Sequence, residues 1–149
     1  MDSLEHRVPP PAVAIILAVL MWLLARPLPA FDGRLWLALP VLLAGLAVCL
    51  AGVASFRRAR TTVNPLKPES ASSLVVAGIY RYTRNPMYLG FAVVLLAWNI
   101  ALASPLALLG VVAFVLYMNR FQIGPEERAL RQLFGAQFDT YCAQVRRWV

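Results

Sequence analysis

Charged residues are scarce in this sequence. Only 14% of the 149 residues are Asp, Glu, Lys or Arg, while 60% are hydrophobic and the mean hydropathy is +0.67. Because about a quarter of an average soluble domain is charged, this composition excludes an ordinary soluble domain. The apolar residues also occur in long blocks, which makes a lipid bilayer the expected environment. The length fits a single domain, residues 1–149.

Cysteines and acidic residues are also few. Cys49 and Cys142 lie far apart, and neither has neighbours at metal-ligand spacing, so we expect two free thiols and no metal site. Seven acidic residues against fourteen Lys and Arg give a net charge of +7. In so apolar a chain we interpret the arginines as membrane anchors and expect no nucleic-acid partner. The first apolar block lacks a signal-peptide cleavage pattern, so we expect it to be retained.

The sequence does contain four apolar segments. No charge occurs from Met87 to Asn119, and one helix of that length would reach roughly 50 Å, too long for a single crossing of a hydrocarbon core of roughly 30 Å. The chain must therefore turn, and Ser104-Pro105 is a helix-start signal where it can do so. The predicted fold is all-α, a polytopic membrane protein with four transmembrane helices at about residues 12–31, 35–56, 87–103 and 105–121.

The arginines predict the orientation in the membrane. The loop of residues 57–86 between the second and third spans is basic, with a single acidic residue, Glu69, whereas the turn between the third and fourth spans has no charge. By the positive-inside rule this loop and both termini face the cytoplasm. We expect a multi-pass protein, in a bacterial inner membrane, with its site on the cytoplasmic side. The basic residues of the loop are Arg57, Arg58, Arg60, Lys67, Arg81 and Arg84.

The C-terminal segment, residues 125–148, has a different pattern. Apolar residues recur there at intervals of three and four, which predicts an amphipathic helix with a possible break at Gly135. We expect this helix to lie along the cytoplasmic interface or to fold back over the spans. The recurring residues are Leu130, Phe134, Phe138, Tyr141 and Val145.

The stretch 80-YRYTRNPMYLG-90 gathers polar and aromatic residues where the third span begins. A purely structural interpretation is available: the arginines are interfacial anchors, the tyrosines form an aromatic belt, and Asn85-Pro86 starts the helix. Pro125-Glu126-Glu127 similarly has the form of a helix start with carboxylates in its first turn. The functional interpretation rests on the combination. Both starts should lie at one face, where cationic, aromatic and acidic groups together suit a zwitterionic cofactor and need neither a metal nor a nucleophilic residue.

Two motifs resemble a known family. The run 74-LVVAGIYRYTRNPMYLG-90, followed after a hairpin by 126-EERALRQLFGAQFDTYCAQVRRW-148, resembles the isoprenylcysteine carboxyl methyltransferase and phospholipid methyltransferase superfamily. Its members are integral membrane enzymes that use S-adenosylmethionine. The resemblance covers roughly residues 56–148. It implies a cofactor pocket built from the third and fourth spans and the C-terminal segment.

The resemblance also implies individual residues. Asn85 stands where the eukaryotic enzymes have the histidine of an Arg-His-Pro-x-Tyr signature, and Glu126 matches the family's cofactor-binding glutamate, with Glu127 completing the pair. Gln122 stands where the prenylcysteine enzymes have a substrate-associated arginine, and Arg120 is our candidate for that role. The expected cofactor-binding residues are Leu74, Val75, Tyr80, Arg84, Asn85, Pro86, Met87, Tyr88 and Glu126.

These residues predict how the cofactor and a lipophilic acceptor are held. Glu126 or Glu127 would pair with the cofactor's ammonium, Arg84 or backbone N–H groups near Asn85 with its carboxylate, and Tyr88 or Tyr80 with its sulfonium. Leu74 and Val75 would line the adenine.

The expected catalytic residues are Arg120 and Glu127. Arg120 would position a carboxylate acceptor, and Glu127 would assist an amine acceptor. The sequence leaves the acceptor open, and two other classes remain: a membrane reductase with a nicotinamide cofactor, and a non-enzymatic membrane scaffold.

Overall fold

The computed structural model describes residues 8–25, 32–59 and 73–149, and all regular structure within them is helical. Short 3-10 helices at Gly78–Arg81 and Pro105–Ala107 and a π-helical turn at Asn119–Ile123 accompany the α-helices. The α-helices are α1 (Pro10–Leu24), α2 (Arg34–Arg58), α3 (Pro86–Leu102), α4 (Leu108–Met118), α5 (Gly124–Phe134) and α6 (Ala136–Gln144).

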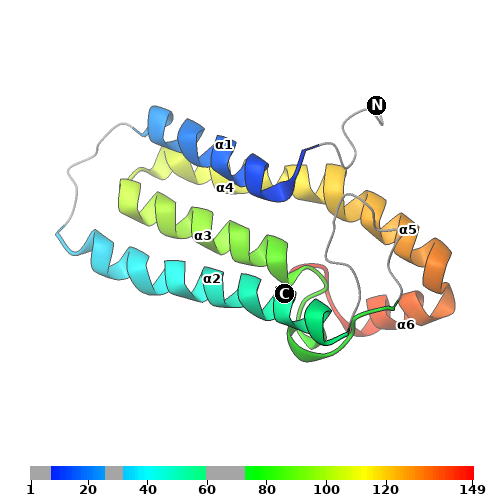
Figure 1. The fold of residues 1–149 in the computed structure, drawn as a ribbon. Coiled ribbons are helices and arrows are strands. Elements are labelled where there is room, and N and C mark those ends of the chain that lie inside the picture. The colour runs from blue at the N-terminus through cyan, green and yellow to red at the C-terminus, as the bar shows by residue number, and fades with distance from the viewer. Residues whose placement is uncertain (1–7, 26–31, 60–72) are drawn as a thin grey trace.

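Helices α1 to α4 lie side by side as a bundle, and α5 and α6 extend from one of its ends (Figure 1). Helix α2 packs along α3, and α1 packs against α4 and α3. Two helices are long and apolar enough to cross a membrane: α2, and the continuous helix Pro105–Phe134 that contains α4 and α5. Helices α1 and α3 are apolar but shorter, with 15 and 17 residues. The predicted first span extends to residue 31, and its residues 26–31 lie outside the described part of the chain.

Glycines bring α2 and α3 into close contact. A Cβ atom added to Gly90 would lie 2.7 Å from the carbonyl oxygen of Gly45, so the two backbones approach more closely than side chains would permit. Next to this crossing, the thiol of Cys49 donates to the carbonyl oxygen of Met87 at 3.4 Å. Cys49 and Cys142 are both free thiols. The crossing lies near the start of α3, close to Tyr88, whose hydroxyl contacts α5.

The junction between α4 and α5 differs from the prediction. We expected the fourth span to end at residue 121 and a new helix to start at Pro125, but one helix runs without interruption from Pro105 to Phe134. Pro125 has no N–H to donate to the carbonyl of Phe121, as an α-helix would require. The π-helical turn just before it accommodates this defect. The predicted fourth span, residues 105–121, is thus the first part of this helix, and α5 is its continuation.

The chain reverses at Gly135, where we expected a break. Gly135 has φ +49°, a conformation that favours glycine, and α6 starts at the next residue. The C-terminal segment, residues 125–148, which we call the tail, is thus two helices rather than one. Three buried residues of the predicted apolar face, Phe138, Tyr141 and Val145, pack with Leu74, Leu130 and Phe134. The tail therefore folds back onto the segment that precedes α3, and the Tyr141 hydroxyl donates to the Tyr80 carbonyl oxygen at 2.7 Å.

Candidate functional site

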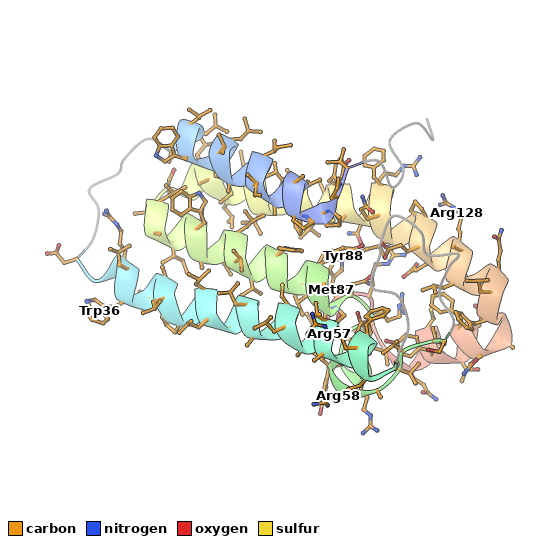
Figure 2. All side chains as sticks on the ribbon, in the orientation of Figure 1. Trp36, Arg57, Arg58, Met87, Tyr88 and Arg128 are labelled. Atoms are coloured by element: carbon orange, nitrogen blue, oxygen red, sulfur yellow. The ribbon has the colours of Figure 1, made fainter. Side chains whose placement is uncertain are left out.

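The two sequence motifs meet at the end of the bundle from which α5 and α6 extend. Tyr88 is buried in the first turn of α3, and its hydroxyl donates to the Glu126 carboxylate on α5. Figure 2 shows Met87 and Tyr88 at this end of α3. The side chain of Glu126 is partly buried. Burial raises the pKa of its carboxyl to about 8, and the charge of Glu127 acts in the same direction, whereas the hydrogen bond from Tyr88 acts to lower that pKa.

Glu127 has a different environment from Glu126. Its Oε1 lies 2.8 Å from Nη2 of Arg84, and its Oε2 lies 2.6 Å from Nη2 of Arg147. Nε of Arg147 also donates to Oε1 at 3.1 Å. Burial alone would raise the pKa of the Glu127 carboxyl, but the hydrogen bonds and charges of Arg147 and Arg84 outweigh it and lower that pKa. Glu127 therefore stays ionised and is a poor proton acceptor.

Arg84 also binds the end of α6. Its Nη1 donates to the carbonyl oxygens of Val145, at 2.6 Å, and Cys142, at 3.1 Å. Those carbonyls lie at the C-terminal end of a helix, where backbone acceptors have no partner within the helix, so the guanidinium acts as a C-terminal cap. The Arg84 side chain is only 14% exposed, and its Nε is buried without a hydrogen-bond partner in the described structure.

The residues on either side of Arg84 hold the same C-terminal segment. Nδ2 of Asn85 donates to the Arg147 carbonyl oxygen at 2.9 Å, and the Thr83 hydroxyl donates to the same oxygen at 3.3 Å. Asn85 occupies the N-cap position of α3 and Pro86 begins the helix, as the structural interpretation of Asn85-Pro86 expected, but the Asn85 side chain makes no capping hydrogen bond. The Asn85 side chain is bound to the tail instead, through the Arg147 carbonyl oxygen.

The backbone N–H groups in this stretch are already bonded. The N–H of Arg84 donates to the Arg146 carbonyl oxygen at 3.0 Å, and that of Asn85 donates to the Thr83 hydroxyl at 3.2 Å. They are therefore not available for a ligand carboxylate in this arrangement.

The remaining cofactor candidates are mostly apolar and lie around the start of α3. Tyr80 is 5% exposed, and its ring meets that of Phe56 edge to face at 5.4 Å. Val75 and Pro86 are buried, whereas Leu74 is partly buried against the α6 cluster. Met87 packs against α2 beside Gly52.

Arg120 and Gln122 lie in the π-helical turn and differ sharply in burial. Arg120 is exposed, with its guanidinium carbon 5.6 Å from the ring centre of Phe121. Gln122 is fully buried. The tail also reaches this turn, because the indole N–H of Trp148 donates to the Asn119 side-chain oxygen at 3.0 Å.

Sequence reasoning missed three residues of this region: Thr83, Arg147 and Trp148. Arg147 belongs to the pair Arg146-Arg147 near the end of the tail, and a basic pair next to an amphipathic helix was the only signal for it. Nothing local in the sequence indicates that its partner is Glu127, twenty residues earlier.

An apolar cavity of about 660 Å³ lies between α1, α2 and α3. Small residues on the three helices line it, together with Phe91 and Pro11. Phe91 follows Tyr88 by three residues, so the two lie on the same side of α3, one turn apart. Lining residues include Ala14, Ala18, Ala38, Leu39 and Trp98.

Comparison with known proteins identifies the family. Residues 33–137 match the family model described as phospholipid methyltransferase, so the chain belongs to the phospholipid methyltransferase family. It is 46% identical over 63 residues to an uncharacterised protein of Haemophilus influenzae, a match that covers 42% of this chain and 100% of that protein.

Plant relatives carry a more specific name. The chain is 36% identical over 103 residues to a probable protein-S-isoprenylcysteine O-methyltransferase of Oryza sativa subsp. indica, covering 67% of this chain and 50% of that protein. It is 29% identical over 141 residues to protein-S-isoprenylcysteine O-methyltransferase A of Arabidopsis thaliana, covering 90% of this chain and 70% of that protein. The chain thus spans half the length of the rice relative. No solved structure matches it.

Proposed function

We propose that this protein is an integral-membrane methyltransferase that uses S-adenosylmethionine and acts on a lipophilic acceptor. The observation that carries the proposal is the hydrogen bond between Tyr88 and Glu126, which joins the two motifs at one end of an apolar bundle. Family membership supports it, because the family and its plant relatives are methyltransferases by name.

The side chains at this end of the bundle fit the methionine portion of the cofactor, which has an ammonium, a carboxylate and a sulfonium group. We assign Glu126 to the ammonium, because a charge-assisted hydrogen bond is stronger where water is partly excluded. We assign the unpartnered Nε of Arg84 to the carboxylate. The backbone N–H groups of Arg84 and Asn85, the alternative donors, are already engaged.

Aromatic and apolar residues complete the proposed pocket. The ring of Tyr88 or Tyr80 would face the sulfonium, a contact of about 1–2 kcal/mol when desolvated. Val75 and Leu74 would contact the adenine, with Pro86 and Met87 beside them. Asn85 would contribute indirectly, since its side chain holds the tail.

Methyl transfer requires alignment more than acid–base chemistry. S-adenosylmethionine supplies a methyl group bonded to a positively charged sulfur. A lone pair of the acceptor would take this methyl group as the carbon–sulfur bond breaks, and S-adenosylhomocysteine would be the other product. The protein has to hold the two reactants in line and exclude water. Trp148 and the residues before it, which the tail brings over the π-helical turn, would contribute to that exclusion.

We place the hydrocarbon part of the acceptor in the apolar cavity between α1, α2 and α3. Its lining includes Phe91, one turn from Tyr88 on α3, so a chain held there would present its polar end near the methyl group. We retain Arg120 as the residue that positions a carboxylate acceptor. For Glu127 we now propose a supporting role, because two arginines hold both its oxygens and it cannot readily accept a proton from an amine.

We further propose four spans with the site on the cytoplasmic side, in a bacterial inner membrane. Figure 2 shows Arg57 and Arg58 at the end of α2 and Arg128 on α5 at one end of the molecule, while Trp36 lies at the other end. Basic residues on the cytoplasmic side fit this orientation, and tryptophan is common at both membrane interfaces.

Ligand binding tests the proposal against the reductase and scaffold alternatives. S-adenosylhomocysteine should raise the melting temperature of the detergent-purified protein, whereas NADPH should not. Stabilisation by NADPH alone would favour a reductase, and stabilisation by neither would favour a scaffold. Incubation with methyl-labelled cofactor and a panel of lipids, apolar acids and apolar thiols would then show which acceptor takes up the label.

A further inference from the structure

The buried amide of Gln122 has one half of its hydrogen-bonding capacity unused. Gln122 is 0% exposed, and its Nε2 donates to the carbonyl oxygen of Val8, just before α1, at 2.8 Å. Its Oε1 is buried without a hydrogen-bond partner in the described structure. Buried polar atoms are nearly always paired, so an unpaired one points to a missing partner.

The hydrogen bond to Val8 fixes which way the amide faces. The partner there is a backbone carbonyl, which can only accept, so the NH₂ group must face it. The oxygen therefore faces the other way and can only accept. Its missing partner is a donor: an N–H or an O–H.

Gln122 and Glu126 lie on the same side of one continuous helix. They are four residues apart across the junction of the π-helical turn and α5, and residues at this spacing are neighbours on a helix surface. Glu126 accepts from Tyr88 through Oε1. This side of the helix thus offers two acceptors one turn apart, a carboxylate and an oriented amide oxygen.

We propose that Oε1 of Gln122 accepts a hydrogen bond from the cofactor's ammonium group, next to Glu126. The inference rests on the proposed function and adds a ligand that the resemblance to the family does not supply. An ammonium has three N–H donors and no acceptor, so it satisfies a carboxylate and an amide oxygen at the same time. A bound water at Oε1 is the competing explanation.

Two ligands separate these explanations: S-adenosylhomocysteine and its analogue that lacks the α-amino group. Gln122→Met replaces the amide by an apolar side chain of similar length and so removes the oxygen. It should weaken S-adenosylhomocysteine binding about tenfold or more, as expected for a lost hydrogen bond to a charged group, and change the affinity of the analogue by less than about threefold. Calorimetry on the detergent-purified full chain measures both affinities.

Trp98→Phe is the matched control. It removes another side-chain hydrogen bond to the α1 segment, from the Trp98 indole to the carbonyl oxygen of Ala18, at 3.0 Å, and it lies away from Glu126. It should leave the affinity ratio of the two ligands unchanged. Equal losses of both ligands in Gln122→Met would overturn the inference, because Gln122 would then act only by tying down the chain at Val8 or by holding water.

A second variant covers the case in which Gln122→Met fails to fold. Gln122→Leu also removes the amide oxygen, with a shorter side chain. It should lower the preference for S-adenosylhomocysteine over the analogue as Gln122→Met does, and an unchanged preference would overturn the inference. If the unmodified protein binds neither ligand, the proposed function itself fails. If it prefers S-adenosylhomocysteine and Gln122→Met and Gln122→Leu keep the same preference, only the role of Gln122 fails.

Discussion

The hydroxyl of Tyr88 donates a hydrogen bond to the carboxylate of Glu126, which lies 38 residues further along the chain. The contact joins the start of α3 to α5. It places an aromatic ring and a partly buried carboxylate side by side at the end of an apolar bundle. Burial, with no cationic partner among the residues that the structure describes, explains the raised pKa of Glu126, whereas Glu127, the next residue, has two arginines and a lowered pKa.

Replacing Glu126 by glutamine should stabilise the ligand-free protein at alkaline pH. The pKa of its carboxyl rises from 4.5 to about 8 on folding, so the folded chain holds the proton more tightly than the unfolded chain. The stability contributed by this proton is complete below pH 4.5 and is lost as pH rises to 8. Glu126→Gln cannot lose it, so its melting temperature should exceed that of the unmodified protein by about 5 °C at pH 8.5 and by little at pH 5. A constant difference across this range would contradict the prediction.

Binding of S-adenosylhomocysteine should release a proton. At pH 7 the free protein has Glu126 largely protonated, and an ammonium favours the carboxylate, so the affinity should rise up to about tenfold per pH unit between pH 6 and 8. Calorimetry in buffers of different ionisation enthalpy measures the proton released. In Glu126→Gln the affinity should fall about tenfold or more and its rise with pH should disappear. A rise that persists in the variant would assign the titration to another group.

Arg84→Leu should destabilise the protein much more than the loss of an exposed arginine. Arg84 is 14% exposed, and its removal leaves Glu127 with one arginine and the end of α6 without its cap. Breaking a largely buried ion pair costs about 3 kcal/mol. Arg131→Gln is the control, because the Arg131–Asp139 pair has the same 2.8 Å separation but side chains 53% and 56% exposed, and such pairs contribute less than about 1 kcal/mol. Denaturation of both variants in the same detergent provides the comparison, and similar losses would refute it.

The two ends of the bundle should be accessible from opposite sides of the membrane. Asp32 precedes α2 at one end, and Gln137 lies on α6 at the other, both exposed. With Cys49 and Cys142 replaced by alanine, Asp32→Cys should react with an impermeant maleimide only from outside, and Gln137→Cys only from the cytoplasmic side. Reaction of both from the same side would reject the proposed topology. Lys67, in the basic loop that we predict to be cytoplasmic, would be a further labelling position, but it lies outside the described residues.

Arg120→Ala should separate alignment from cofactor binding. If Arg120 positions the acceptor, its loss should leave the affinity for S-adenosylhomocysteine within about threefold and lower turnover by roughly a hundredfold. Arg120→Lys should restore little, since lysine lacks the forked geometry that orients a carboxylate. Arg58→Ala, an exposed arginine at the end of α2, serves as the control for a membrane anchor and should retain activity. Full activity in Arg120→Ala would make that residue an anchor too.

Local patterns in the sequence predicted the helices well and their junctions less well. The uncharged run from Met87 and the signal at Ser104-Pro105 placed α3 and the following turn within a residue or two. The same patterns predicted that the helix starts carrying Tyr88 and Glu126 lie at one face. Pro125 misled the prediction because proline normally starts a helix, whereas here a π-helical turn lets the helix continue through it.

The partners of Arg84 and Asn85 could not be predicted from sequence. An arginine before a span fits an interfacial anchor and an asparagine before a proline fits a helix cap, and both local interpretations are sound. In the structure both side chains bind the tail instead, because its carbonyl oxygens at residues 142–147 need donors once α6 ends. Such a need depends on tertiary structure, which local spacing does not encode.

The attachment of Thr83, Arg84 and Asn85 to residues 142–147 also sets the order in which the protein can be built. The helices of the bundle can enter the membrane and pack as they emerge during synthesis. The segment before α3 cannot acquire its folded partners until residue 147 has been made, since those partners are the last carbonyls of α6 and the residues after it. The pocket proposed for the cofactor is therefore the last part of the molecule to form. A chain stalled before that residue would hold a bundle without the proposed site at its end.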